Sequence, residues 1–174
     1  LSNKVLTLAK LEQHKLEMNK KEDPLSPMIE DLIEKFTIKT EKTIHFTTDL
    51  KTEKVYADEE FLKEAISNLI DNAIKYSKES VKINISSSSD ANHDIINIYD
   101  NGIGIPQKDQ KKIFEKFERA SAIKQTRKGG PSGFGLGLNY VYQVMEAHEG
   151  RVYINSIEGE FSEFSLLIPK IIES

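Results

Sequence analysis

The pattern of hydrophobic and polar residues predicts helices and strands along most of the chain. Apolar residues at helical spacing predict helices over 1–20, 27–42, 58–77 and 136–148. Alternating or short apolar runs bounded by polar turns predict strands over 43–50, 54–57, 81–87, 94–99, 151–156 and 163–168. Because helices interrupt pairs of strands, we expect an α/β (α+β) two-layer sandwich, a mixed sheet covered on one face by helices.

Two prolines, at positions 24 and 27, divide the first helix from the rest. They predict a linker over residues 21–26, with the main domain over 27–170. The helix over residues 1–20 begins without an N-cap and carries one narrow apolar stripe. It is either packed on its own domain or the stub of a helical partner region, and the residues favour neither.

Composition excludes several classes of protein. The 174 residues have a net charge of -4, which does not indicate a nucleic-acid partner. The chain contains no cysteine, so disulfides and thiolate metal sites are excluded. Residues 1–20 are too charged for a signal peptide, and no apolar run is long enough to cross a membrane. We therefore expect a soluble domain without direct membrane contact.

The helix over 58–77 carries an unusual polar face. Asn68, Asn72 and Lys75 recur at i, i+4 and i+7, away from the apolar stripe. Amides are mediocre helix formers, whereas a metal bound to phosphates accepts neutral carbonyl ligands. The face is either merely solvated or part of a site for a metal and phosphates.

A turn rich in glycine follows the strand over 94–99. Asp100 is followed by Gly102 and Gly104, so the backbone there can approach a flat ligand closely. A buried carboxylate at Asp100 can accept a hydrogen bond from an exocyclic amine such as that of adenine. An ordinary Asx turn that closes the strand is the alternative.

Residues 107–132 form a long basic connection. They hold eight basic and three acidic residues, a local net charge of +5 in an acidic chain. Loops of this length are usually lids or disordered, and the charge indicates a polyanionic ligand, although a solvated loop is the alternative. Phe114 and Phe117, with Ile113, make a small apolar cluster that either anchors the loop or offers a patch to a partner.

Three glycines, at positions 133, 135 and 137, open the last helix. They expose its first amides, where the helix dipole favours phosphate. Neither the P-loop nor the dinucleotide fingerprint fits this spacing. A glycine triplet alone is weak evidence, but it follows an amide-lined helix, an Asp-x-Gly-x-Gly turn and a basic loop.

In this order of motifs the chain resembles the ATP-binding catalytic domain of sensor histidine kinases, with the Bergerat fold of the GHKL superfamily. The similarity runs from about Leu25 to Pro169. Residues 1–12 resemble the end of the dimerisation and phosphotransfer helix of that family. The resemblance implies an ATP lid over about 107–132, with Phe114 and Phe117 as the phenylalanine box.

The resemblance also implies roles for individual residues. Asn68 and Asn72 match the N box, and Asn72 is the principal Mg²⁺ ligand. Lys75 and Arg119 are expected to meet the phosphates, and these four residues form the catalytic set. The implied nucleotide site comprises Asn72, Lys75, Tyr76, Asp100, Gly102, Gly104, Ile105, Arg119, Gly133, Gly135, Leu136, Gly137 and Leu138.

The chain departs from the family pattern at a few positions. The family often has Ser or Thr at Phe134 and Gly at Glu149 and Phe161. No histidine in the chain has the acidic and proline neighbours of a phosphoacceptor, so we do not expect this fragment to phosphorylate itself.

The function implied is transfer of the γ-phosphoryl group of Mg-ATP to a histidine on a helical domain. That histidine would then supply a response-regulator receiver domain, and the parent kinase would be a homodimer with its catalytic domain in the cytoplasm. One alternative is a nucleotide-binding regulatory module without transfer activity. Another is an ATPase of the same fold, but Asn68 stands where related ATPases carry a glutamate that activates water.

Overall fold

The computed structural model describes residues 17–113 and 133–171, with the side chains of the last helix described from residue 137. The helices of this part are α2 (Leu25–Lys39), α3 (Glu59–Lys75), α4 (Gln107–Gln110) and α6 (Gly133–Ala147). The strands are β1 (Lys21–Pro24), β2 (Thr43–Leu50), β3 (Lys54–Ala57), β4 (Ser80–Ser89), β5 (His93–Asp100), β6 (Arg151–Ile157) and β7 (Phe161–Pro169).

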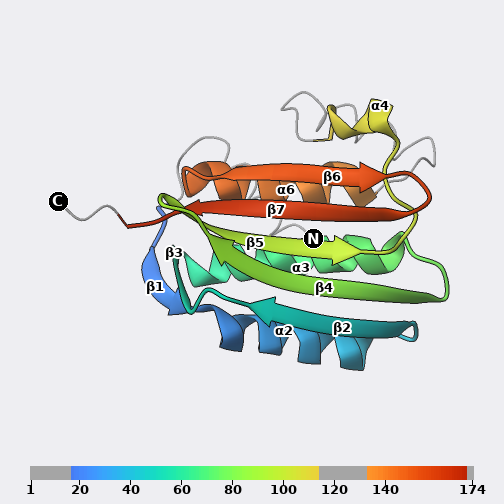
Figure 1. The fold of residues 1–174 in the computed structure, drawn as a ribbon, viewed down its shortest axis with the longest axis horizontal. Helices are drawn as coiled ribbons and strands as arrows, with labels where there is room; N and C mark the ends of the chain where they lie inside the picture. The colour runs from blue at the N-terminus through green and yellow to red at the C-terminus, as the bar shows by residue number, and fades with distance from the viewer. Residues whose placement is uncertain (1–16, 114–132, 172–174) are drawn as a thin grey trace.

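Five strands form one mixed sheet in the order β2-β4-β5-β7-β6. Strand β2 runs parallel to β4, and the other neighbouring pairs are antiparallel. Helices α2, α3 and α6 lie together on one face of this sheet (Figure 1). The predicted mixed sheet with helices on one face is therefore confirmed.

The core lies between the sheet and these helices. Alternate residues of the strands point inward, so that β4, β5 and β7 each contribute a row of apolar side chains. Helix α3 covers these rows with an apolar stripe that includes Leu62, Ile66 and Leu69. Each such side chain contributes about 1.5–3 kcal/mol by burial, so the stripe fixes how α3 lies on the sheet.

One segment differs in kind from its prediction. Lys21–Pro24, expected to be part of a linker, forms β1 and pairs antiparallel with β3 in a separate two-stranded sheet. Four mostly exposed residues that end in proline carry no alternation of their own. Pairing with a strand that lies thirty residues later is a tertiary contact, which the local pattern does not encode.

Several helix ends also differ from their predictions. Helix α3 ends at Lys75 rather than Ser77, and α6 begins at Gly133 rather than Leu136. Glycines have low helix propensity, so the pattern placed the start of α6 too late. The predicted N-cap of α3 is confirmed, since the Asp58 side chain accepts a hydrogen bond from the Phe61 amide.

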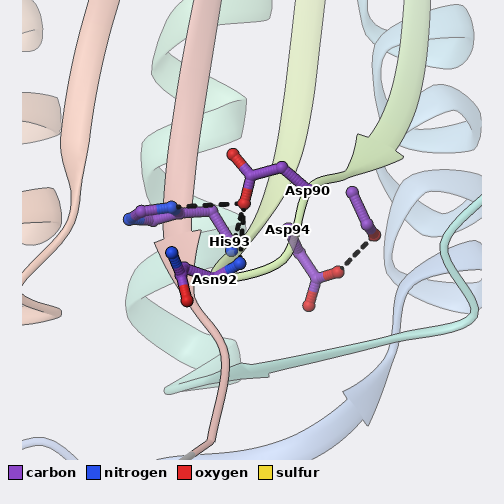
Figure 2. A network of polar contacts seen from close by, with 5 residues as sticks. Asp90, Asn92, His93 and Asp94 are labelled. Atoms are coloured by element: carbon purple, nitrogen blue, oxygen red, sulfur yellow. Dashed lines mark hydrogen bonds and ion pairs between the residues drawn. The ribbon is translucent and has the colours of Figure 1, made fainter.

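The β4–β5 hairpin closes with a polar turn. Oδ1 of Asp90 accepts hydrogen bonds from the backbone amides of Asn92 (2.8 Å) and His93 (2.7 Å), as Figure 2 shows. The hydrogen bond from Asn92, followed by that from His93, lowers the pKa of Asp90. Beside the turn, the Ser89 hydroxyl donates to Asp94 at 2.6 Å. The turn lies at the start of β5, at the opposite end of that strand from Asp100.

Candidate functional site

Five of the sequence-predicted site residues line one pocket at the end of the sheet where β5 stops and β7 begins: Asn72, Tyr76, Asp100, Gly104 and Ile105. The last turn of α3, the loop after β5 and the first residues of β7 enclose a small pocket there. It is lined by Asn72, Ala73, Tyr76, Asp100, Gly104, Ile105, Ser162 and Phe164. Three segments far apart in the sequence therefore build one cavity.

Asp100 is the buried acid of this pocket. It is the last residue of β5 and is 6% exposed. The Gly102 amide donates to its Oδ1 at 2.9 Å, and among the described residues no other hydrogen bond reaches this carboxylate. Burial raises the pKa of Asp100 to about 6, against a lowering by the Gly102 bond. Asp100 thus keeps acceptor capacity toward the cavity.

The two glycines of the loop after β5 are required by close backbone contacts. A Cβ on Gly102 would lie 2.6 Å from the Tyr76 carbonyl oxygen and 2.8 Å from Oδ1 of Asp100. Gly104 has a φ of 71°, and a Cβ there would fall on the Ile157 carbonyl. The Ile103 amide donates to the Tyr76 carbonyl at 2.9 Å, which ties this loop to the end of α3.

A serine of β6 supports the loop and a serine of β7 lines the pocket, and sequence reasoning missed both. The Ser156 hydroxyl accepts from the Ile105 amide at 2.8 Å and donates to the Phe161 carbonyl at 2.7 Å. Ser162 lines the pocket itself. A signal was present, because Ser162 occupies the buried register of β7, whose other inward residues are apolar.

The predicted amide face of α3 is buried. Asn72 is 6% exposed and lines the pocket, and Asn68 lies buried one turn earlier, outside the pocket lining. Within residues 17–113 and 133–171, Nδ2 of Asn72 has no hydrogen-bond partner. An amide held at the pocket without a partner can turn its oxygen to a ligand or a metal. Lys75 is exposed beside Asp71, with Nζ and Oδ2 3.2 Å apart.

Helix α6 lies antiparallel to α3. His148 follows its end and contacts Asp58, which caps the beginning of α3. Burial, followed by the charges of Glu64, Glu60 and Asp58, raises the pKa of Tyr140 midway along α6. The start of α6 therefore lies near the Asn72 end of α3. Leu138 is fully buried, whereas a Cβ on Gly137 would meet no atom of the described residues within 4 Å.

Other predicted residues cannot be placed in the same way. Gly133 and Gly135 belong to the first turn of α6, and the side chain of Leu136 is not described. Arg119, Phe114 and Phe117 lie outside the described residues. Ile113, at the edge of the described part, packs against the core, which favours an anchoring role for that residue.

Comparison with known proteins decides the family. Residues 57–172 match the model of the histidine kinase-, DNA gyrase B- and HSP90-like ATPases. The chain belongs to this ATPase family. It is 31% identical over 169 residues to the adaptive-response sensory kinase SasA of Crocosphaera subtropica, covering 95% of this chain and 43% of SasA. It is 30% identical over 173 residues to the sensor histidine kinase WalK of Bacillus subtilis, covering 97% of this chain and 28% of WalK.

Within this ATPase family the fold is that of the histidine kinases. The solved catalytic domain of the histidine kinase ThkA aligns with a TM-score of 0.73 and 26% identity, over 90% of this chain and 100% of that domain. The chain is thus an ATP-binding catalytic domain of the kind found in sensor histidine kinases. It spans less than half the length of the two curated relatives named above.

Proposed function

We propose that this domain binds Mg-ATP and donates the γ-phosphoryl group to a histidine on a helical domain. The observation that carries the proposal is that Asp100 and Asn72 line one pocket from two different elements. The first presents a buried acceptor suited to the exocyclic amine of adenine, and the second an amide suited to the metal and phosphates. One pocket thus combines recognition of the base with a place for the reactive end of the nucleotide.

The donor set of α3 fits Mg²⁺. Among the described residues no group of three or more His, Cys, Asp or Glu side chains could hold a metal ion. Mg²⁺ suits such a sparse site, because it keeps several waters and takes phosphate oxygens as ligands. Asn72 is the principal protein ligand in this proposal, with Asn68 one turn earlier as the second. When bound, Mg²⁺ neutralises phosphate charge.

The remaining roles concern positioning and charge. Tyr76 lies beside the base, and Gly102, Gly104 and Ile105 shape its pocket. Lys75 can leave its exposed pairing with Asp71 at little cost in free energy and meet the phosphates. Arg119 and the amides at the start of α6, with Gly133, Gly135, Leu136, Gly137 and Leu138, complete the phosphate side.

Transfer to histidine is favoured over hydrolysis. A neutral imidazole is already a nucleophile, so it needs no strong base. Water does need one, and an amide such as Asn68 cannot accept its proton. The alternatives are an ATPase and a nucleotide-binding regulatory module without transfer.

The partners follow from the same proposal. Residues 1–20 would be the end of a dimerisation and phosphotransfer helix, joined by a linker to the catalytic domain at 27–170, and the parent would be a homodimer. The histidine kinase ThkA has been solved in complex with the response regulator protein TrrA, and we infer a receiver-domain partner of that kind here. In the described part no helix is long and apolar enough to span a membrane. We place the domain in the cytoplasm, where ATP is available.

A transfer assay tests the proposal. The domain is mixed with γ-labelled ATP, Mg²⁺ and a histidine-bearing helical domain, and label on the helical domain is followed alongside phosphate release. The proposal expects label that disappears when the acceptor histidine is replaced. ATP binding without label would favour the regulatory module, and steady phosphate release without label would favour the ATPase.

A further inference from the structure

His148 occupies a buried position where α6 ends and α3 begins. It is 1% exposed. Its Nδ1 lies 2.7 Å from the carbonyl oxygen of Val144, one turn earlier in α6. Its Nε2 accepts a hydrogen bond from the backbone amide of Asp58 at 2.9 Å. One side chain therefore bonds to both helices of the nucleotide site.

These partners define the tautomer of the ring. A carbonyl oxygen only accepts, so Nδ1 carries the hydrogen, and a backbone amide only donates, so Nε2 is bare. The ring is accordingly neutral. Burial is the largest effect on the pKa of His148 and lowers it, and the Lys20 charge also lowers it. The hydrogen bond to the Val144 carbonyl and the Asp58 charge raise it, but the pKa stays below its ordinary value. The net effect disfavours a second proton on the ring.

Asp58 makes this contact a junction of three segments. Its backbone amide donates to His148, and its Oδ1 accepts from the Phe61 amide in the first turn of α3. Its Oδ2 accepts from the Asn19 amide at 2.9 Å, so the chain that leads into the domain is held at the same residue. The end of α6 is thus bonded to the N-cap of α3.

The position of this junction bears on the distant phosphate side. Helices α3 and α6 are antiparallel, and fourteen residues separate Asp58 from Asn72, as fourteen separate His148 from Phe134. At 1.5 Å per residue each distance is about 21 Å. Apolar packing tolerates small sliding of one helix along another, whereas a directional hydrogen bond does not. A bond at one end of the pair therefore sets the offset at the other.

We propose that His148 is a positioning residue, which holds the start of α6 in register with the Asn72 end of α3 by accepting the Asp58 amide. The inference rests on the proposed phosphate role of α6. His148 touches neither the base pocket nor Asp100, so its effect should fall on the phosphates and spare the adenine. Nothing in this role requires His148 to give or take a proton.

Two variants of matched length test the inference. In His148→Gln the side-chain oxygen can replace Nε2 as the acceptor, whereas His148→Met has a similar length and no acceptor of that strength. ATP and adenosine affinities of the whole chain are measured with Mg²⁺ at pH 7.5, after circular dichroism and thermal melting show that each variant is folded. His45→Gln, on the exposed face of β2, is the control for loss of a histidine.

The inference expects a change in the ratio of the two affinities. For His148→Met the ATP affinity should fall about tenfold and the adenosine affinity less than about twofold, as for a loss of alignment at the phosphates. His148→Gln and His45→Gln should keep the wild-type ratio. An unchanged ratio in His148→Met, or an equal loss of both affinities, would overturn the inference, as would a His148→Gln ratio that falls like that of the methionine variant.

A measurement on the unaltered chain covers the case in which His148→Met does not fold. The ¹⁵N shifts of the His148 ring at pH 7.5 should report a neutral imidazole with its proton on Nδ1. The opposite tautomer or a doubly protonated ring would overturn the inference. If the unaltered chain binds adenosine but gains no affinity from phosphates, the phosphate role of α6 is itself wrong, and this inference falls with it. Failure of histidine transfer alone leaves these results unaffected.

Discussion

The Gly102 amide and the Asp100 carboxylate form the only hydrogen bond that the described residues give to this buried acid, at 2.9 Å. A single bond offsets little of the cost of burying a charge. Burial accordingly raises the pKa of Asp100 to about 6. At neutral pH the Asp100 carboxylate is therefore ionised although its buried position favours the protonated form. It lies at the place where we propose that the base amine binds.

Replacing Asp100 by asparagine should raise stability. The folded pKa of about 6 lies above the unfolded value of 3.8, so the native state binds the extra proton between them. This contribution to stability is present at low pH and is lost as pH rises through 6. Asp100→Asn removes the charge and should add about 1–3 kcal/mol to the unfolding free energy at pH 7.5, with most of that gain absent at pH 4. Urea unfolding at both pH values measures it.

The same variant should weaken adenine recognition. The amide can present a donor to the base amine, so ATP affinity should fall at least about tenfold while stability rises. Asp94→Asn, at the other end of β5, is the matched control and should leave the ATP affinity unchanged. If the Asp100→Asn variant is more stable and binds ATP as tightly as the unaltered domain, Asp100 does not recognise the base.

Adenosine binding to the unaltered domain should depend on pH. The base amine donates to the ionised carboxylate, so the affinity should be constant above about pH 7 and fall below about pH 6, approaching tenfold per unit. Adenosine is suited to this test because it lacks the titrating phosphates of ATP. Titrations from pH 5 to 8 should show this fall for the unaltered domain and a flat profile for Asp100→Asn.

Local patterns account for what could be predicted from the sequence, and tertiary contacts account for what could not. The amide face of α3 and the Asp100 turn were predictable, because helical spacing and the glycine turn are both local signals. β1 was not, since it exists only by pairing with β3. The Ser156 support for the loop and the place of Ser162 in the pocket lining likewise depend on strands that lie about fifty residues further along the chain.

Asn72→Ala should remove the metal-dependent part of ATP binding. It deletes the amide that lines the pocket without a hydrogen-bond partner for Nδ2 among the described residues. ATP affinity with Mg²⁺ should fall to about the value without Mg²⁺, and adenosine affinity should stay within about twofold. Calorimetric titrations with and without Mg²⁺ measure this. Asn155→Ala, on the exposed edge of β6, should keep the Mg²⁺ effect. A Mg²⁺ effect that survives in Asn72→Ala would contradict the assigned ligand.

Gly102→Ala and Gly137→Ala should change the stability of the domain in opposite directions. At Gly102 the new Cβ would meet the Tyr76 carbonyl at 2.6 Å, so the loop must shift and stability should fall by about 2 kcal/mol or more. At Gly137 the new Cβ would meet no described atom within 4 Å, so helix propensity should raise the stability of the ligand-free domain by about 1 kcal/mol. Thermal and urea unfolding of the two variants compare them.

The two glycine variants should also differ in their affinities for ATP and adenosine. If phosphates approach the open space at Gly137, Gly137→Ala should lower the ATP affinity and leave the adenosine affinity unchanged. Gly102→Ala should weaken both, because the displaced loop carries Asp100's hydrogen-bond donor. Equal ATP affinity in Gly137→Ala and the unaltered domain would count against phosphate contact at that residue.

Glu149→Gly should stabilise the domain. Glu149 has a φ of 59° and is the only described residue other than glycine with a positive φ. It follows α6 in a C-terminal turn in which the Gly150 amide donates to the Met145 carbonyl at 2.8 Å. A side chain in this left-handed region is strained by about 1–2 kcal/mol.

Phe161, the other position at which the resemblance led us to expect glycine, is not strained in this way. Its backbone has no positive φ, and its ring stacks on Tyr99 with centroids 5.6 Å apart.

Three substitutions by glycine test this difference. Because it relieves the strain, Glu149→Gly should raise the unfolding free energy by about 0.5–1 kcal/mol, after the entropy that glycine adds to the unfolded chain is subtracted. Phe161→Gly should lower it, and Glu34→Gly, at an exposed position inside α2, should lower it by about 1 kcal/mol. Urea unfolding of the three variants compares them, and a loss of stability in Glu149→Gly would contradict the strain assigned to this turn.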